Sequence, residues 1–317
     1  MGISFKLVVD GHCDTLTAAP GQNRDIGRFS SHGQLDLPRM VSGGLNVQFF
    51  AAFISPRYKD WALKKCLQYI DAFYMLMEKN KEIVEPAFDA GGIRKIAGAG
   101  KAAALLAVEG GEALSGDLAV LRMLHRLGVR SITLTWNGRN ELGDGVGEGE
   151  TAGGLSLYGR AVVMEMNRLG MLVDVSHLSE KGFWDVAEVS GRPFAATHAN
   201  CHALCDHPRN LTDAQIEHLA NSGGVVGLSF VPAFVHPSKP DLEALIKHVD
   251  HIAERFGTQC IGLGSDFDGM DDYLPGLEDA TCLPRLAEEL MARGYSYDHV
   301  SDIMGGNWMR LLDQVLK

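Results

Sequence analysis

The sequence is poor in basic charge and has no long apolar run. Its 317 residues carry 29 Lys and Arg against 40 Asp and Glu, a formal net charge of −11, and the basic residues form no cluster. Because neutralising phosphates requires a basic face, we exclude a nucleic-acid-binding protein. No apolar stretch approaches the roughly 20 residues that a membrane span needs, so no membrane partner is expected. What remains is an ordinary globular composition, 46% apolar and 22% charged.

The chain also lacks the signals of secretion and of disulfide bonding. The N-terminal segment MGISFKLVVDGHCDT has one Lys and a short apolar run that leads directly into polar residues, unlike a signal peptide. The six cysteines show no CxxC spacing, so reduced, mostly structural thiols are expected. We therefore predict a cytoplasmic protein.

Short apolar runs rich in β-branched residues recur along the chain, each followed by turn signals. There are eight, over residues 7–10, 47–53, 103–108, 131–135, 172–175, 194–197, 225–230 and 260–264. Segments with the 3.6-residue apolar period of helices lie between most of them, over 61–78, 118–127, 157–169, 181–189, 216–220, 242–256 and 283–293, and a last helix is predicted over about 298–315. Eight buried strands alternating with helices favour an α/β fold with a closed (β/α)8 TIM barrel. We predict a single barrel domain over residues 1–317, although the length alone would also allow two domains.

Local signals mark several helix ends. Thr212 and Gln215 form a T-x-x-Q capping box, and Ser179 can cap the helix that follows it. Gly128 and Gly170 stand where two helices should end.

Two connections are long, over residues 15–44 and 137–155. The second is rich in glycine and acidic residues, NGRNELGDGVGEGETAGG. Its glycines resemble a phosphate cradle only faintly, and its acidic side chains would repel phosphate, so nucleotide binding is rejected. Loops at the carboxyl end of a barrel often build an active site, and the alternative is a mobile surface loop.

Histidines and carboxylates gather at the carboxyl ends of the predicted strands, where the reactive residues of such barrels lie. They are His12, Asp14, Glu109, His177, His198 and Asp266. Three imidazoles and three carboxylates are the ligand mixture expected for zinc or a similar divalent ion. Two metals bridged by one carboxylate would use five of these groups and leave Asp266 as a general base. The predicted chemistry is hydrolysis.

Each of these residues is a weak signal by itself. In a strand, alternation points His12 and Asp14 to one face and Cys13 to the other. Glu109 ends a buried apolar strand, where only a cation or strong hydrogen-bond donors could satisfy its carboxylate. An isolated histidine is more often structural, so the shared end of one barrel is what favours a metal site.

Arg209 and Asn210 follow the sixth predicted strand on the same side of the barrel. A guanidinium there suits a substrate carboxylate, and the alternative for Arg209 is a bond to a backbone carbonyl or an acidic neighbour. His248, on a predicted helix, is expected to face solvent or to pack. His202 and His207 lie near the rim and stay open.

Ordered motifs then identify a family resemblance. The segments DGHCDT, LLAVEGGEAL, LGVRSITLTWN, GGLSLYGRAVVMEMNRLGMLVDVSH, PFAATHANCHALCDHPRNLTD, IGLGSDFDG, GLED and GGNWMRLL resemble the membrane (renal) dipeptidase family of zinc metallopeptidases, from about residue 8 to 312. The resemblance implies a barrel of the metal-dependent amidohydrolase type, two Zn²⁺ ions per chain, and hydrolysis of small dipeptides, often L-Xaa-D-Xaa. Relatives of this kind are often dimers, so a homodimer is expected.

The resemblance also implies a role for each metal-binding position. His12 and Asp14 would bind the first zinc, Glu109 would bridge the two ions, and His177 and His198 would bind the second.

Two further roles are implied for the substrate. Arg209 would hold its terminal carboxylate, and Asp266 would carry the proton from a metal-bridging hydroxide to the leaving amine. Asp268 is two residues away and could share the face of Asp266, so spacing alone does not separate the two.

The sequence departs from the family at one position. Where well-known members carry a histidine that donates to the substrate carbonyl, this chain has Trp136. An indole N–H can donate one hydrogen bond but cannot carry charge or transfer a proton. Trp136, Asn137 or Arg139 could replace that donor, or the substrate could differ.

Two alternatives therefore stay open. A related amidohydrolase acting on another amide or a lactone would keep the metals but would not need Arg209. A non-catalytic metal-binding or peptide-binding protein would make Trp136 a sign of lost activity.

Overall fold

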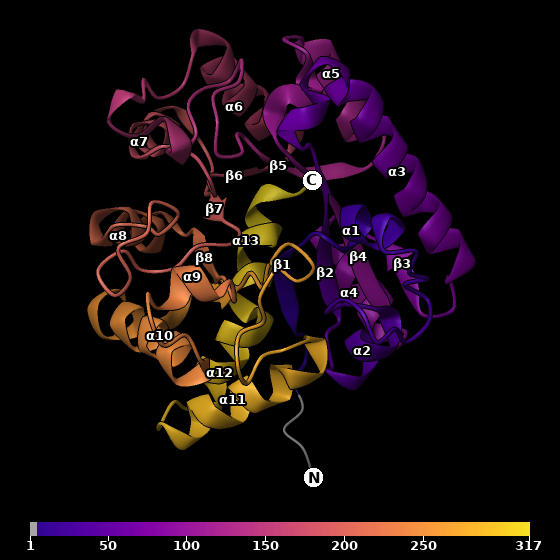
Figure 1. The fold of residues 1–317 in the computed structure, drawn as a ribbon, viewed down its shortest axis with the longest axis vertical. Coiled ribbons are helices and arrows are strands. Elements are labelled where there is room, and N and C mark those ends of the chain that lie inside the picture. Colours follow the sequence, from indigo (N-terminus) through magenta and orange to yellow (C-terminus); the bar gives the residue numbers. More distant parts are fainter. Residues whose placement is uncertain (1–4) are drawn as a thin grey trace.

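The structure, a computed structural model, describes residues 5–317, and within that range the strands form one parallel sheet (Figure 1). The strands are β1 Val9–Cys13, β2 Val47–Phe53, β3 Val84–Pro86, β4 Ala102–Glu109, β5 Val129–Thr133, β6 Leu172–Asp174, β7 Ala195–Ala196, β8 Val225–Leu228 and β9 Ile261–Leu263. Because β1 pairs with both β2 and β9, and β2 pairs with β4, all of them except β3 close into an eight-stranded barrel. The predicted (β/α)8 fold is confirmed.

Helices surround this barrel (Figure 1). The α-helices are α1 Thr15–Gly21, α2 Leu37–Ser42, α3 Ala62–Lys79, α4 Ala90–Gly98, α5 Leu118–Arg126, α6 Leu157–Leu169, α7 Glu180–Val189, α8 Asp213–Ser222, α9 Pro232–Val235, α10 Leu242–Phe256, α11 Leu283–Ala292, α12 Tyr297–Ser301 and α13 Asn307–Val315. None of the described helices combines the length and the apolar character needed to cross a bilayer.

Local cap predictions are confirmed. The Thr212 and Gln215 capping box opens α8, and the Ser179 side chain accepts from the third residue of α7. Gly170 ends α6 in the left-handed conformation, and Gly128, also at positive φ, follows the end of α5.

The structure extends the first strand beyond the predicted apolar run and adds two short helices to the long connection after it. Strand β1 runs to Cys13 instead of ending at residue 10, so His12 lies within the strand. Its pairing register shifts between Asp10 and Cys13, an irregularity that an apolar run does not reveal. The connection over residues 15–44 is not a bare loop, because it contains α1 and α2.

The sequence prediction also missed β3 and α4, which lie between α3 and β4. Strand β3 has three residues and pairs with the first residues of β4. Helix α4, AGGIRKIAG, is short and contains three glycines, which weaken a helical signal. The predicted last helix has the correct span, but a π-helical turn over Asp302–Gly306 separates α12 from α13.

Helix α13 closes the amino-terminal end of the barrel. Its Trp308 is fully buried, packs against Phe49 with ring centroids 5.4 Å apart, and donates from Nε1 to the carbonyl of Leu263 at 2.9 Å. A Cβ on Gly11 would collide with the Trp308 ring, so glycine in β1 lets the indole approach the strand. The opposite, carboxyl-terminal end is therefore the one left open for a site.

Candidate metal centre and substrate cavity

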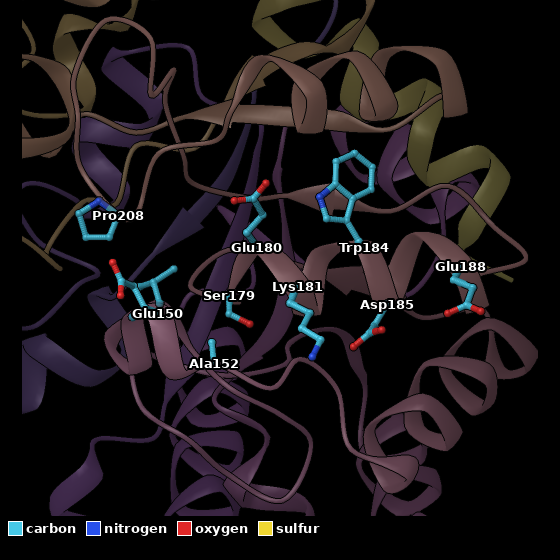
Figure 2. Close-up of a pocket in the computed structure, with 11 residues that line it drawn as sticks. Glu150, Ala152, Ser179, Glu180, Lys181, Trp184, Asp185, Glu188 and Pro208 are labelled. Atoms are coloured by element: carbon cyan, nitrogen blue, oxygen red, sulfur yellow. The ribbon is translucent and has the colours of Figure 1, made fainter.

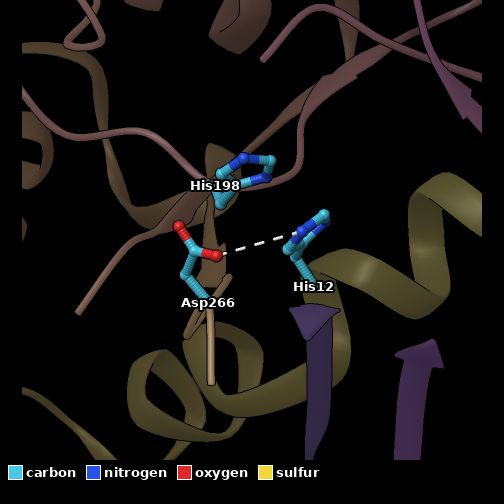
Figure 3. Close-up of side chains that lie close together, drawn as sticks. All are labelled: His12, His198 and Asp266. Atoms are coloured by element: carbon cyan, nitrogen blue, oxygen red, sulfur yellow. Dashed lines mark ion pairs between the residues drawn. The ribbon is translucent and has the colours of Figure 1, made fainter. Parts of the chain in front are cut away.

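Three imidazoles and three carboxylates meet at the carboxyl end of the barrel, as the sequence predicts. The structure brings together His12, Asp14, Glu109, His177, His198 and Asp266, all of them buried. They form three overlapping groups that could each hold a metal ion: one of His12, Asp14 and Glu109, one of Glu109, His177 and His198, and one of His12, His198 and Asp266. Figure 3 shows the last group, with side chains from β1 and from the ends of β7 and β9.

The Glu109 carboxylate faces two ligand sets with its two oxygens. Oε2 lies 3.4 Å from Nε2 of His12, whereas Oε1 lies 2.9 Å from Nε2 of His177 and 3.7 Å from Nε2 of His198. Asp14 adds to the first set, with its Oδ2 3.7 Å from Nε2 of His12. Glu109 ends β4, where it is 3% exposed and held between β2 and β5. This carboxylate stands between the two halves of the centre.

Hydrogen bonds fix which nitrogen of His198 carries its proton. The Thr197 hydroxyl donates to Oδ2 of Asp174 at 2.6 Å, so its oxygen is left to accept from Nδ1 of His198 at 2.9 Å. Asp174 is a buried carboxylate that also accepts from the backbone N–H groups of Ser176 and Thr197. The Nε2 atom of His198 therefore presents a lone pair to the centre.

The same reasoning applies to His177. Its Nδ1 lies 2.7 Å from Oδ1 of Asn137, an acceptor, so Nδ1 carries the proton and Nε2 presents a lone pair. The two Nε2 atoms of His177 and His198 are 2.9 Å apart. Two lone pairs and a carboxylate oxygen at such distances repel one another unless a cation stands among them.

Burial sets the charge of these groups. Desolvation lowers the pKa of His177 to about 4 and that of His198 well below its ordinary value, which keeps both imidazoles neutral and able to bind a metal. Burial opposes charge on His12 too, but the carboxylates of Glu109 and Asp14 raise its pKa well above the ordinary value. Nε2 of His12 is nevertheless buried without a hydrogen-bond partner. The centre thus has donor atoms suited to a divalent cation.

Asp266 and Asp268 differ in what their carboxylates bind. Asp268 is saturated: Oδ2 accepts from Thr15 at 2.7 Å and from Arg24 at 2.6 Å, and Oδ1 accepts from the Gln34 backbone at 2.6 Å. The Asp268 carboxylate therefore links the connection over residues 15–44 to the loop after β9.

Asp266 instead faces the centre, with Oδ1 3.9 Å from Nε2 of His12. Burial raises its pKa to about 7, with further increases from Asp14 and Glu109. A Cβ on Gly269 would overlap the carboxylates of both Asp14 and Asp266, so glycine makes room for them. Of the two aspartates, Asp266 is therefore the one whose carboxylate faces the centre, whereas that of Asp268 is bonded outside it.

Backbone strain concentrates at this end of the barrel. His177, Asp266 and Asp268 have φ near +66°, at 65°, 67° and 66°, in the left-handed region that favours glycine. The 137–155 segment supports one of them, because the Val146 N–H donates to the His177 carbonyl at 2.8 Å. Such strain persists where surrounding contacts hold it, as at functional sites.

The 137–155 segment is built into the site. Asp144 accepts from the backbone of Gly153 and pairs with Arg139 at 2.6 Å. Arg139 also pairs with Glu148, so its guanidinium serves the segment itself and not the cavity. Asn137, predicted to bind substrate, is the residue that orients His177.

Arg209 is 4% exposed and lies beside the centre, as predicted. It donates from Nη2 to the His198 carbonyl at 2.8 Å and stands over the Phe234 ring, while its buried Nε has no hydrogen-bond partner. The bond to a backbone carbonyl, one of the two alternatives, is present, and binding of a substrate carboxylate stays a prediction. Asn210 is structural, because its side chain bonds three backbone groups.

A cavity of about 480 Å³ opens over the centre, within the usual size range of small-molecule sites. It is lined by Asp14, Thr17, Phe53, Glu109, Trp136, Asn137, His177, His207, Arg209, Val231, Phe234, Asp266, Asp268 and Gly269. His207 is thus placed at the site, whereas the half-exposed His202 pairs with Asp206 outside it.

A second cavity, of about 590 Å³, lies beside α7 and contains none of the predicted site residues (Figure 2). Its charged lining residues are mostly acidic, with Glu150, Glu180, Asp185 and Glu188 against Lys181, and the exposed Trp184 lies among them. It lacks the converging imidazoles of the first cavity.

Sequence reasoning missed the residues that orient the ligands. Asp174 and Thr197 position His198, and Phe53 forms part of the cavity wall. A signal was present for Asp174, an acidic residue within the apolar run Leu-Val-Asp-Val, because a buried carboxylate needs several donors. Phe53 offered no signal, because an aromatic residue at a strand end is equally suited to the core.

Comparison with known proteins supplies the family. The family model described as membrane dipeptidase (peptidase family M19) matches residues 4–317. Dipeptidase tcpJ of Claviceps purpurea is 36% identical over 295 residues, which cover 89% of this chain and 69% of the relative. Dipeptidase aclJ of Aspergillus oryzae is 34% identical, covering 97% of this chain and 78% of the relative.

Solved structures agree in fold across nearly the whole chain. A dipeptidase of family M19 superposes with a TM-score of 0.91 at 33% identity, covering 98% of both chains. A metallopeptidase from Rhodobacter sphaeroides, bound to a phosphinate mimic of the dipeptide L-Ala-D-Ala, also gives 0.91 at 32% identity, covering 98% of this chain and all of its own. The chain belongs to the membrane dipeptidase family, peptidase family M19, and is a hydrolytic enzyme of the dipeptidase class.

Proposed function

We propose that the protein is a binuclear zinc dipeptidase. The observation that carries this proposal is the orientation of Glu109, whose Oε2 faces His12 and whose Oε1 faces His177 and His198. A carboxylate with one oxygen toward each of two ligand sets is the arrangement of a bridging ligand. His12 and Asp14 would hold one ion, and His177 and His198 the other.

The donor chemistry favours zinc. Neutral imidazoles and carboxylates suit Zn²⁺, and the unpartnered Nε2 of His12 and the opposed lone pairs of His177 and His198 are the features that a cation would satisfy. When bound, the two ions would polarise the peptide carbonyl and lower the pKa of the attacking water.

The remaining charged groups fit the two ends of a dipeptide. Arg209, after β7, has an unpaired nitrogen for the terminal carboxylate of the substrate. Asp266, after β9, offers negative charge for its ammonium group. The cavity has room for a dipeptide, and the phosphinate mimic of L-Ala-D-Ala bound by the Rhodobacter sphaeroides relative supports L-Xaa-D-Xaa substrates.

Asp266 would move the proton. Its carboxylate faces the centre and lines the cavity, so it would accept a proton from the attacking water and donate it to the nitrogen as the C–N bond breaks. Asn137 and Thr197 would hold the imidazoles in the tautomers that expose Nε2.

A second candidate is hydrolysis of another amide or of a lactone. It is favoured by Trp136, which stands where well-known family members have a histidine, and it does not require Arg209. Substitution of Arg209→Met separates the two candidates. A dipeptidase should show a raised KM for substrates with a free carboxylate, and an unchanged KM would favour the alternative.

The direct test combines metal analysis with a substrate matrix. The purified protein should contain about two zinc ions per chain, and L-Xaa-L-Xaa and L-Xaa-D-Xaa dipeptides should be turned over in proportion to zinc loading. Glu109→Gln should reduce both metal content and turnover. A single ion per chain would contradict the binuclear centre, and no turnover of any dipeptide at full loading would contradict the dipeptidase.

A further inference from the structure

Trp136 is the cavity residue that the proposed chemistry leaves without a role. It follows β5, lies against Phe53 with ring centroids 5.4 Å apart, and stands 5.9 Å from the His177 ring. Among residues 5–317, no hydrogen bond uses its indole N–H. The two aromatic rings form one continuous apolar surface beside the metal ligands.

This aromatic pair has a defined place around the barrel. In barrel order, Phe53 follows β2, Glu109 ends β4 and Trp136 follows β5. Arg209 follows β7, which lies opposite β2 and therefore across the barrel from Phe53, and Trp136 packs against Phe53. The carboxylate-binding side of the cavity has its own apolar residues, Val231 and Phe234, after β8.

That placement assigns the two residues of a substrate. Because the Arg209 guanidinium lies 5.3 Å from the centre of the Phe234 ring, a dipeptide whose carboxylate meets Arg209 would place its C-terminal residue near Phe234 and Val231. Its ammonium group would then point toward Asp266, after β9, and β9 is paired with β1, which is paired with β2. The side chain of the N-terminal residue would then lie beside Phe53, which follows β2, and beside Trp136, which packs against Phe53.

We propose that Trp136, with Phe53, is the specificity wall for the N-terminal residue of the substrate, and that it selects large apolar or aromatic side chains there. This inference rests on the proposed dipeptidase function. The physical reason is that an apolar side chain placed on two aromatic rings leaves water, and one pocket contact of this kind discriminates between substrates by about 10-fold to 100-fold in kcat/KM. A histidine at position 136 would offer a polar, hydrated edge instead.

The test is a kinetic matrix on the zinc-loaded enzyme and its variants. Substrates are Ala-Ala, Leu-Ala, Phe-Ala and Ala-Leu, in the stereochemistry that the enzyme accepts. The wild type should prefer Phe-Ala and Leu-Ala over Ala-Ala by about 10-fold or more. Trp136→Ala should remove most of that preference while changing the Ala-Leu to Ala-Ala ratio by less than about threefold.

Trp136→Phe separates a wall from a hydrogen-bond donor. It keeps an apolar ring but removes the N–H, so the N-terminal preference should persist. The proposal is overturned if Trp136→Phe lowers kcat by a similar factor for every substrate while Trp136→Ala keeps the preference for an apolar N-terminal residue. That result would show that the indole N–H of Trp136 donates to the substrate carbonyl.

Controls distinguish the possible failures. Trp184→Ala removes a tryptophan from the other cavity and should leave all ratios unchanged (Figure 2). Zinc content is measured for each variant, because Trp136 packs near His177, and ratios are compared at equal zinc loading. If the wild type hydrolyses no dipeptide, the proposed function fails. If it hydrolyses dipeptides without an apolar N-terminal preference, or if Trp136→Ala keeps that preference, only this inference fails.

Discussion

The two ends of the barrel are built from opposite kinds of side chain. At the amino-terminal end, Trp308 of α13 fills the interior against Phe49 and glycines of the neighbouring strands. At the carboxyl-terminal end, buried carboxylates and imidazoles face one another, and non-glycine residues such as His177 and Asp266 adopt positive φ. The amino-terminal end therefore stabilises the barrel, whereas the carboxyl-terminal end holds the buried ionisable groups and the strained backbone that are typical of a functional site.

The same strands contribute side chains to both ends of the barrel. In β4 the apolar residues Ala103 and Leu105 belong to the cluster around Trp308, and Glu109 of the same strand face lies at the metal centre. A substitution at either end should thus change one property and leave the other.

Replacing Asp266 should have the largest effect, and it should be on rate. Asp266→Asn removes the carboxyl proposed to exchange the proton, so kcat should fall by about 10²-fold to 10⁴-fold. Thermal stability should hold or rise, because a buried carboxylate with a raised pKa is lost. Steady-state kinetics of the zinc-loaded protein and thermal unfolding of the metal-free protein provide the two measurements.

The matched control for that variant is Asp268→Asn, the same change two residues away. Asp268 is bonded to Arg24, Thr15 and the Gln34 backbone, so this variant should lose stability more than rate. If the two variants show the same kinetic defect, the distinction drawn between these aspartates is wrong.

Truncating Trp308 should destabilise the protein at the amino-terminal end of the barrel. Trp308→Ala leaves a large cavity and an unpaired Leu263 carbonyl, and should lower the free energy of unfolding by about 3–5 kcal/mol. Urea unfolding measures this loss, and Trp308→Phe should show a smaller one. At temperatures where the variant is folded, KM and kcat should stay within about twofold of wild type, and a selective loss of zinc would contradict the separation of the two ends.

Acid should destabilise the site end through a histidine outside the metal centre. His248 of α10 accepts from the Cys201 N–H and contacts the Val235 carbonyl, and burial lowers its pKa to about 4 from an ordinary value of 6.5. As pH falls, the unfolded chain binds the proton first. The contribution of His248 to the free energy of unfolding is therefore complete above about pH 6.5. It is lost as the pH falls toward 4, by about 3 kcal/mol in total.

His248→Gln isolates this contribution, because glutamine can both accept and donate without titrating in this range. The free energy of unfolding of the variant should fall less steeply between pH 6.5 and 4 than that of the wild type. The metal ligands and the neighbouring His236 and His251 are common to both proteins, so they cancel in the difference. Parallel pH profiles would show that His248 does not carry the effect.

The fold and the candidate metal ligands were more predictable from sequence than the residues that orient those ligands. Apolar runs followed by a His or an acid predicted a barrel and placed Glu109 and His198 at its carboxyl end, because both inferences depend on local patterns along one strand. The orienting contacts of Asn137 and Asp174 join segments that are distant in the chain, so no spacing rule reveals them. Helix α4 was missed because its glycines mask the period that its buried isoleucines follow.

The smallest predicted effect is on metal affinity, through one of those supports. Asn137→Ala removes the acceptor that orients the His177 imidazole, and loss of such a partner typically weakens metal binding by about 10-fold to 100-fold. Asn140→Ala is the matched control, because Asn140 lies in the same segment and its side chain bonds the backbone of Leu134, Leu142 and Gly143 instead of a metal-ligand candidate. Competitive zinc titration against a chelator should show weakened binding in the first variant alone, whereas the second should lower only thermal stability. Equal zinc affinities in the two variants would mean that the left-handed backbone at His177, held by Val146, is sufficient to aim the imidazole.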